Sequence, residues 1–135
     1  MDFRIWDKVN QKMHYDVLLS SGKYKLAMIP NEETGTWDEL DYNNIIPMRS
    51  TSNLHKSKTT IFEFDIVKEI DNYYLVLWKD YRLVLYDYYN SFNDNPLDGF
   101  ADDSVELEVV GNMFNTPELM EKVEGYETLK IRFDL

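Results

Sequence analysis

The sequence contains no cysteine, so it offers no disulfide framework, no thiolate zinc site and no cysteine nucleophile. It also lacks any apolar run near the roughly 18 residues that cross a bilayer. The charged start over Met1–Asp7 argues against a secretory signal. These absences predict a soluble protein that acts in the cytoplasm and does not bind a membrane.

Glycine and histidine are scarce, with five and two copies. The glycines are scattered and complete no phosphate-binding loop or nucleophile elbow. His14 and His55 show none of the spacings of zinc motifs. Aspartates that could hold a hard cation lack the spacing of an EF-hand; they are Asp94, Asp98, Asp102 and Asp103. We expect no catalytic residue, metal site or cofactor, although paired-carboxylate hydrolysis depends on a separation in space.

Composition and turn spacing indicate the fold class. A chain of 135 residues with 44% hydrophobic residues suits one compact domain. Aromatic and β-branched residues gather in short runs, as they do in strands. The predicted strands cover residues 3–6, 13–19, 24–29, 61–68, 73–78, 82–89, 105–109 and 128–133. Many short strands with frequent turns predict a mainly β fold, a small barrel or roll.

One helix is predicted, near residues 117–124. Asn115 or Thr116 can cap its start, and Pro117 suits the first helical turn. Gly125 is placed to end it. The sequence therefore predicts one short helix in the C-terminal part of an otherwise β chain.

The longest polar stretch divides the chain. Residues 47–60 contain no acid and are predicted to form an exposed loop between an N-terminal β subregion, residues 1–46, and a second part, residues 61–135. The basic residues of this loop could touch phosphates; they are Arg49, His55, Lys56 and Lys58. No aromatic residue lies among them to stack on a base, which favours a solvated loop.

The net charge of −11 opposes a general affinity for nucleic acid or anionic membranes. Residues 94–127 carry ten acids against one lysine, a net charge of −9. This segment is either a solvated face or a surface for a cationic partner, including a nucleic-acid-binding protein whose DNA it imitates. The candidate partner-binding acids are Asp94, Asp98, Asp102, Asp103, Glu106 and Glu108.

Three segments, Phe3–Asp7, Ile61–Val67 and Val109–Met120, resemble the YopX family, small proteins encoded by phages and prophages of Gram-positive bacteria. The third is the most specific, because Gly111-Asn112 is followed by Asn, Pro, Glu and Leu at the family's spacing. The chain departs from the pattern at Phe64, where the family usually has glycine before the aspartate. It also lacks the family's glycines in the loop before this motif.

The resemblance implies an SH3-like β-barrel over residues 61–135, joined to the N-terminal β subregion, and it implies no activity or catalytic residue. The residues themselves indicate structural roles. We expect Asp65 to bond backbone N–H groups, Gly111-Asn112 to turn the chain, and Trp6 and Trp78 to lie in the core. His14 is expected to be a structural histidine with its hydrogen bonds satisfied.

These observations lead to three functional hypotheses. The first is an uncharacterised phage-type accessory protein that acts as a non-enzymatic protein-binding module, its partner unknown or a second copy of the chain. The second is an acidic decoy, a nucleic-acid mimic that occupies a host DNA-binding protein. The third is weak nucleic-acid binding through residues 49–58.

Overall fold

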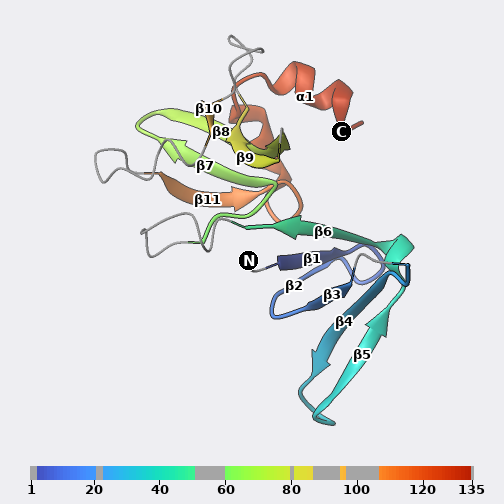
Figure 1. Ribbon diagram of the computed structural model, residues 1–135. Coiled ribbons are helices and arrows are strands. Elements are labelled where there is room, and N and C mark those ends of the chain that lie inside the picture. The colour runs from blue at the N-terminus through green and yellow to red at the C-terminus, as the bar shows by residue number, and fades with distance from the viewer. Residues whose placement is uncertain are drawn as a thin grey trace. The chain divides into compact units, whose positions relative to one another are not determined.

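The computed structural model describes residues 3–20, 23–50, 60–79, 81–86, 95–96 and 107–134 (Figure 1). The chain divides into an N-terminal unit, Met1–Ser50, and a C-terminal unit, Thr51–Leu135. The described strands form three antiparallel sheets, two in the first unit and one in the second. The prediction of a mainly β fold is confirmed. No helix in these ranges is long and apolar enough to cross a membrane.

The first sheet of the N-terminal unit has the order β2-β1-β6. Its strands are β1 (Phe3–Asp7), β2 (Lys12–His14) and β6 (Ile45–Arg49). Ile5 and Ile45 are buried here together with Ala27. Trp6 is 7% exposed, which confirms its predicted place in the core.

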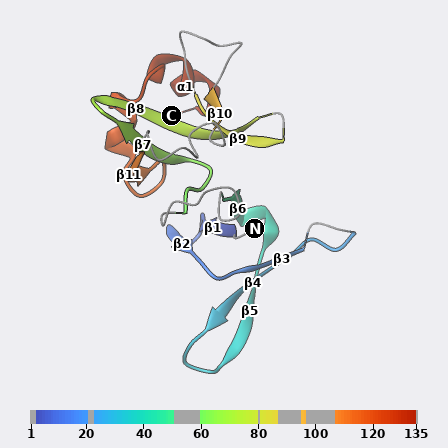
Figure 2. The same cartoon turned by 60° about the vertical axis from the view of Figure 1, so that its left-hand side comes forward.

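The second sheet of this unit has the order β3-β4-β5. Its strands are β3 (Leu18–Ser20), β4 (Leu26–Asn31) and β5 (Thr36–Leu40), followed by a short 3₁₀ helix, η1 (Tyr42–Asn44). The β4–β5 turn closes through Asn31 Oδ1, which accepts the backbone N–H groups of Glu33 and Thr34. Within this unit, the β4–β5 hairpin extends away from β1 and β6 in both views (Figures 1 and 2).

The C-terminal unit holds one sheet with the order β10-β9-β8-β7-β11. Its strands are β7 (Asp65–Glu69), β8 (Asn72–Lys79), β9 (Arg82–Leu85), β10 (Asn95–Pro96) and β11 (Glu108–Asn112). Successive side chains along β7 and β8 point to opposite faces of the sheet, so they form two cores. One core lies around Ile66 and Leu75, and the other lies around Val67 and Val76. The first core also takes in Met120 of a 3₁₀ helix, η3 (Pro117–Lys122), and Leu129 of α1 (Tyr126–Arg132).

The predicted helix near residues 117–124 and the predicted strand over residues 128–133 need correction. Residues 117–122 form the 3₁₀ helix η3, and the α-helix α1 covers the segment predicted as a strand. Gly125 lies between them with φ 73°, a left-handed conformation that suits glycine. It therefore separates the two helices where it was expected to end a single one.

Two further predictions are corrected within the described residues. None of the three sheets closes into a barrel there, so the mainly antiparallel β class is confirmed and the SH3-like closure is not. The loop predicted over residues 47–60 starts later, because β6 continues to Arg49, with Met48 fully buried and Pro47 paired opposite Ile5. Residues 51–59 lie outside the described ranges.

Two residues have the structural roles expected of them. Asp65 is buried, and its Oδ2 accepts the backbone N–H of Phe62 at 2.8 Å. Asn112 Oδ1 accepts the backbone N–H groups of Phe114 and Asn115 at 3.0 and 2.8 Å. Such side chain to backbone bonds hold tight turns, so both predictions are confirmed.

Candidate functional site

The β3–β4–β5 sheet presents one face outside the core. Register places Leu18 opposite Met28 and Met28 opposite Glu39, and it places Pro30 opposite Trp37. Directly paired residues, and residues two apart on one strand, share a face of a sheet. The opposite face carries Ala27 and its neighbours toward the core. We call the side away from this core the outer face, formed by Leu18, Ser20, Leu26, Met28, Pro30, Trp37 and Glu39.

The outer face exposes large apolar side chains. Trp37 is 44% and Leu18 is 52% exposed, and Met28 between their strands is half-buried. A lone exposed apolar residue is common, but adjacent apolar residues on paired strands indicate an interaction surface. An indole ring beside a proline and a thioether offers the aromatic contact that protein interfaces favour.

β5 lies at the edge of this sheet. In the part of the chain that the structure describes, β5 pairs with β4 alone. Four of its five residues are exposed. An exposed edge strand presents unpaired backbone N–H and C=O groups that another strand can bond. Residues 32–41, which include β5, also carry five acids and no lysine or arginine.

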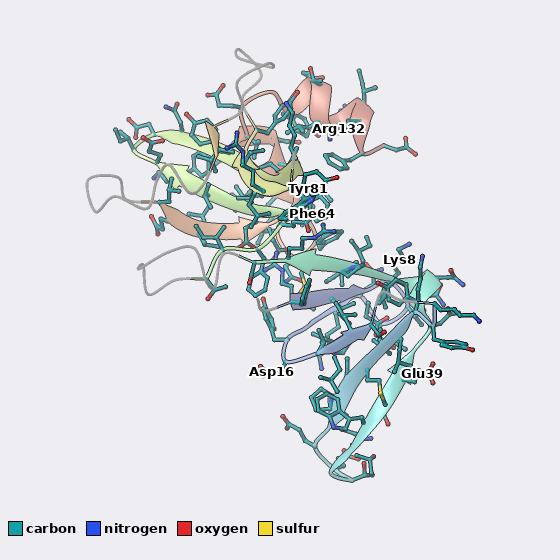
Figure 3. All side chains as sticks on the ribbon, viewed as in Figure 1. Lys8, Asp16, Glu39, Phe64, Tyr81 and Arg132 are labelled. Atoms are coloured by element: carbon teal, nitrogen blue, oxygen red, sulfur yellow. The ribbon has the colours of Figure 1, made fainter. Side chains whose placement is uncertain are left out.

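An open pocket of about 560 Å³ lies at the end of β5, lined by Lys25, Glu39, Leu40, Asp41, Tyr42 and Asn43. Lys25 Nζ lies 5.7 Å from the centre of the Tyr42 ring, and Asp41 Oδ1 accepts the backbone N–H of Asn43 at 3.0 Å. Glu39, labelled in Figure 3, belongs to both the pocket and the outer face. The pocket thus places two carboxylates and one ammonium beside the apolar surface.

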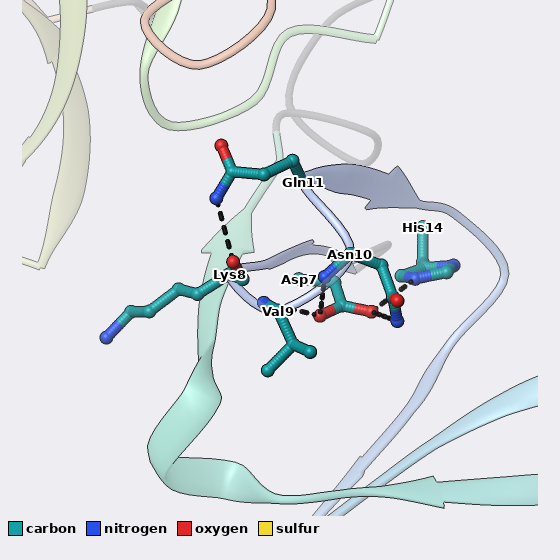
Figure 4. Close-up of polar contacts among 6 residues, drawn as sticks. All are labelled: Asp7, Lys8, Val9, Asn10, Gln11 and His14. Atoms are coloured by element: carbon teal, nitrogen blue, oxygen red, sulfur yellow. Dashed lines mark hydrogen bonds and ion pairs between the residues drawn. The ribbon is translucent and has the colours of Figure 1, made fainter.

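Asp7 and His14 belong to a polar cluster at the turn between β1 and β2 (Figure 4). Asp7 accepts hydrogen bonds from Val9 N and from the backbone and side chain of Asn10, and His14 Nε2 lies 3.2 Å from Asp7 Oδ2. Burial opposes ionisation, but the bonds from Asn10, His14 and Val9 outweigh it and hold the pKa of the Asp7 carboxyl below its ordinary value.

This cluster fixes the β1–β2 turn. It confirms the expectation that His14 is a structural histidine with a hydrogen-bond partner. Among the residues that the structure describes, no three histidine, aspartate or glutamate side chains gather closely enough to hold a metal ion. The bonds from Val9, Asn10 and His14 to Asp7 hold this turn, and we take the outer face as the candidate site.

Most of the residues predicted as sites lie outside the described ranges. Of the acidic candidates, Glu108 is described: it is exposed at the start of β11, opposite Lys68. Of the basic candidates, Arg49 is described: it is exposed at the end of β6. The candidates outside the described ranges are Asp94, Asp98, Asp102, Asp103, Glu106, His55, Lys56 and Lys58.

The outer face was missed as a site in the sequence. The sequence feature that could have indicated it is the run of acidic residues around Trp37, residues 32–41. The larger excess of acidic residues at 94–127 drew the prediction to that segment instead. The general expectation that strand edges and aromatic residues serve as interfaces points to this place on the fold.

Comparison with known proteins identifies the chain. A family model described as YopX protein matches residues 2–121, nearly all of the N-terminal unit and most of the C-terminal unit. The chain belongs to the YopX family. The three segments that suggested this family lie within the matched residues.

Two solved structures are similar to this YopX chain. Protein yopX from Bacillus subtilis is 17% identical, with a TM-score of 0.63 over 88% of this chain and 97% of that chain. Protein EF1440 from Enterococcus faecalis is 20% identical, with a TM-score of 0.58 over 87% of this chain and 96% of that chain. At these identities the likeness shows the fold alone. No curated protein matches the chain.

The departure of this YopX chain from its family at Phe64 has a structural explanation. Phe64 has φ 66°, in the left-handed region where glycine is favoured. Its ring meets Phe114 and Phe133 edge-on, with centroids 5.7 and 5.8 Å apart. Such contacts contribute about 0.5–1.5 kcal/mol each beyond apolar burial. The two ring contacts therefore offset the strain that a side chain incurs at this position.

Proposed function

We propose that this YopX protein is a non-enzymatic protein-binding module that acts in the cytoplasm of a host cell, and that the outer face of β3–β4–β5 is its binding surface. One observation carries the proposal. Trp37, 44% exposed, lies directly opposite Pro30 on a sheet face turned away from the core. Burying an indole ring of this kind on binding is a common source of interface energy.

The surface around Trp37 supports the proposal in two ways. Leu18 and Met28 continue the apolar surface across the sheet, so a partner would cover a continuous patch. Glu39 and the pocket beside it supply a polar rim. An apolar centre with a polar rim is the usual anatomy of a protein interface.

Capture of binding proteins from a lysate of the natural host tests this proposal. We expect the wild-type chain to capture a specific partner and Trp37→Ser to lose most of it. Tyr81→Ser in the C-terminal unit is the matched control, because Tyr81 is an aromatic residue that is 93% exposed (Figure 3). Equal capture by the two variants would contradict the proposal. Circular dichroism of both variants checks that the fold is retained.

The acidic decoy, nucleic-acid binding and self-association stay predictions, and each can be tested separately from binding through the outer face. A charge mimic should lose its partner when capture is repeated at high salt, because screening weakens exposed charge interactions. A partner held by the outer face should remain, since apolar burial does not depend on that attraction. Nucleic-acid binding through residues 49–58 predicts weaker DNA retention in a Lys56/Lys58→Glu double variant. Sedimentation at several concentrations tests whether the partner is a second copy of the chain.

A further inference from the structure

The free edge of β5 can accept another strand. Within the described ranges β5 pairs with β4 alone, and Thr36 through Glu39 are all exposed. A chain segment laid along this edge would find backbone donors and acceptors at every second residue. Strand addition of this kind gives affinity through main-chain bonds and specificity through alternate side chains.

Charge selects the strand that fits. Asp38 and Glu39 are neighbours on β5 and point to opposite faces of the sheet. An added strand would therefore meet a carboxylate on each of its two faces. In the described residues the side chain of Glu39 has no hydrogen bond or ion pair, and Asp38 Oδ2 accepts one bond, from Asn31 Nδ2 at 3.1 Å. Lysine or arginine on the added strand would complement both carboxylates.

The residues beside Glu39 indicate which other side chains the added strand would need. Trp37 lies two positions before Glu39 on the same face, so an apolar residue two positions from a basic one would contact both. The pocket past Glu39 also contains Asp41, which gives a long cationic side chain a second carboxylate. Lys25 lies over the Tyr42 ring in the same pocket and would oppose a second cation on that side.

We propose that the partner of this protein presents an extended basic segment, with lysine or arginine at two adjacent positions and an apolar residue two positions from one of them, that pairs with β5 as a fourth strand of the β3–β4–β5 sheet. This inference rests on the proposed function, because it names the partner chemistry of the same surface. It adds main-chain pairing at β5 and a requirement for positive charge.

A peptide titration followed by nuclear magnetic resonance tests the inference. The probe is a short blocked peptide with the order valine-lysine-lysine-valine, added to the isotope-labelled full chain. We expect the amide resonances of residues 36–40 to shift. A peptide with glutamate in place of lysine should bind at least about tenfold more weakly, because several exposed charge contacts are reversed. The lysine peptide with every second backbone nitrogen methylated should also bind about tenfold more weakly, because it cannot complete the main-chain hydrogen bonds to β5.

Charge reversal at one position provides the matched test. Glu39→Lys should remove most of the preference for the lysine peptide over the glutamate peptide, because Asp38 alone of the two carboxylates would then attract lysine. Glu121→Lys makes the same change of net charge on η3 in the C-terminal unit and should leave the preference as it is in the wild type. Equal binding of the methylated and unmethylated peptides would overturn strand addition. Equal binding of the lysine and glutamate peptides would overturn the charge requirement.

The result also separates this inference from the proposed function. Suppose that no peptide shifts the β5 resonances, while Trp37→Ser still loses the partner captured from lysate. Strand addition is then wrong, and protein binding through the outer face stands. If Trp37→Ser retains the partner, the proposed function fails whatever the peptides do. Shifts of β5 resonances on concentrating the chain alone would identify a second copy as the occupant and overturn the proposal.

Discussion

Gly111 lies so close to Thr116 that a Cβ on Gly111 would overlap the Thr116 hydroxyl oxygen. That hydroxyl accepts the backbone N–H of Asn112 at 2.8 Å and donates to the Asn112 carbonyl at 2.9 Å. The side chain of Asn112 bonds two further backbone groups of the same turn. This set of bonds leads the chain out of β11 toward η3 and leaves no space for a side chain at Gly111.

Gly111→Ala should therefore destabilise the protein. The added methyl must displace the Thr116 side chain or break its two bonds, which we expect to cost about 2–3 kcal/mol. Gly35→Ala is the control, because a Cβ at Gly35 meets nothing within 4 Å and its φ of 71° gives only backbone strain, about 1–2 kcal/mol. Chemical denaturation measures both free energies of unfolding. A smaller loss for Gly111→Ala than for Gly35→Ala would contradict this account of the turn.

At Phe64 we expect glycine to destabilise the protein less than alanine does, which reverses their usual order. Glycine normally destabilises an ordered position by about 0.5–1 kcal/mol relative to alanine. At φ 66° the side chain of alanine is strained and glycine is not. Both variants lose the ring contacts with Phe114 and Phe133, so Phe64→Gly should unfold at a higher denaturant concentration than Phe64→Ala. If Phe64→Ala proves the more stable, backbone strain does not act at this position.

Asp7 makes the stability of the N-terminal unit depend on pH. The pKa of Asp7 is lower in the folded chain than in the unfolded chain. The ionised carboxylate therefore stabilises the fold above the pKa of the unfolded chain, and this contribution is lost as pH falls toward the pKa of the folded chain. Asp7→Asn should cost about 1–3 kcal/mol at neutral pH, because its side chain cannot accept every bond.

The difference in free energy of unfolding between wild type and Asp7→Asn should accordingly shrink as the solution is acidified. Asp71→Asn serves as the control, since the side chain of Asp71 is exposed and makes no hydrogen bond within the described part of the chain. Its difference from wild type should stay small throughout. A constant difference for Asp7→Asn would show that the bonds from Asn10 and His14 do not favour the ionised form.

The fold class could be predicted from the sequence because apolar and polar residues alternate along it. The prediction failed where the same alternation fits both a strand and a helix. Leu129, Ile131 and Phe133 alternate as in a strand, but Leu129 and Phe133 also share one face of a helix. The structure buries Leu129 and leaves Ile131 84% exposed, as a helix requires. The predicted strand over residues 13–19 is interrupted at Asp16, which has φ 55° and separates β2 from β3.

The candidate site was less predictable than the fold. Sequence could indicate that Trp37 and its acidic neighbours are unusual, but not that Pro30 lies opposite Trp37. That pairing depends on the register of β4 with β5, which the turn after Asn31 sets. Exposure of the β5 edge depends in addition on which strands pair with each other, and this follows from the packing of the whole sheet.

The most direct test of protein binding through the outer face is site-specific photocrosslinking in a lysate of the cells in which the protein is naturally made. A photoreactive phenylalanine analogue replaces Trp37 in one sample and Tyr81 in another, and both positions are exposed. The account predicts a defined crosslinked partner at position 37 that excess wild-type protein competes away and excess Trp37→Ser does not, with none at position 81. A defined partner at position 81 and none at position 37 would contradict it.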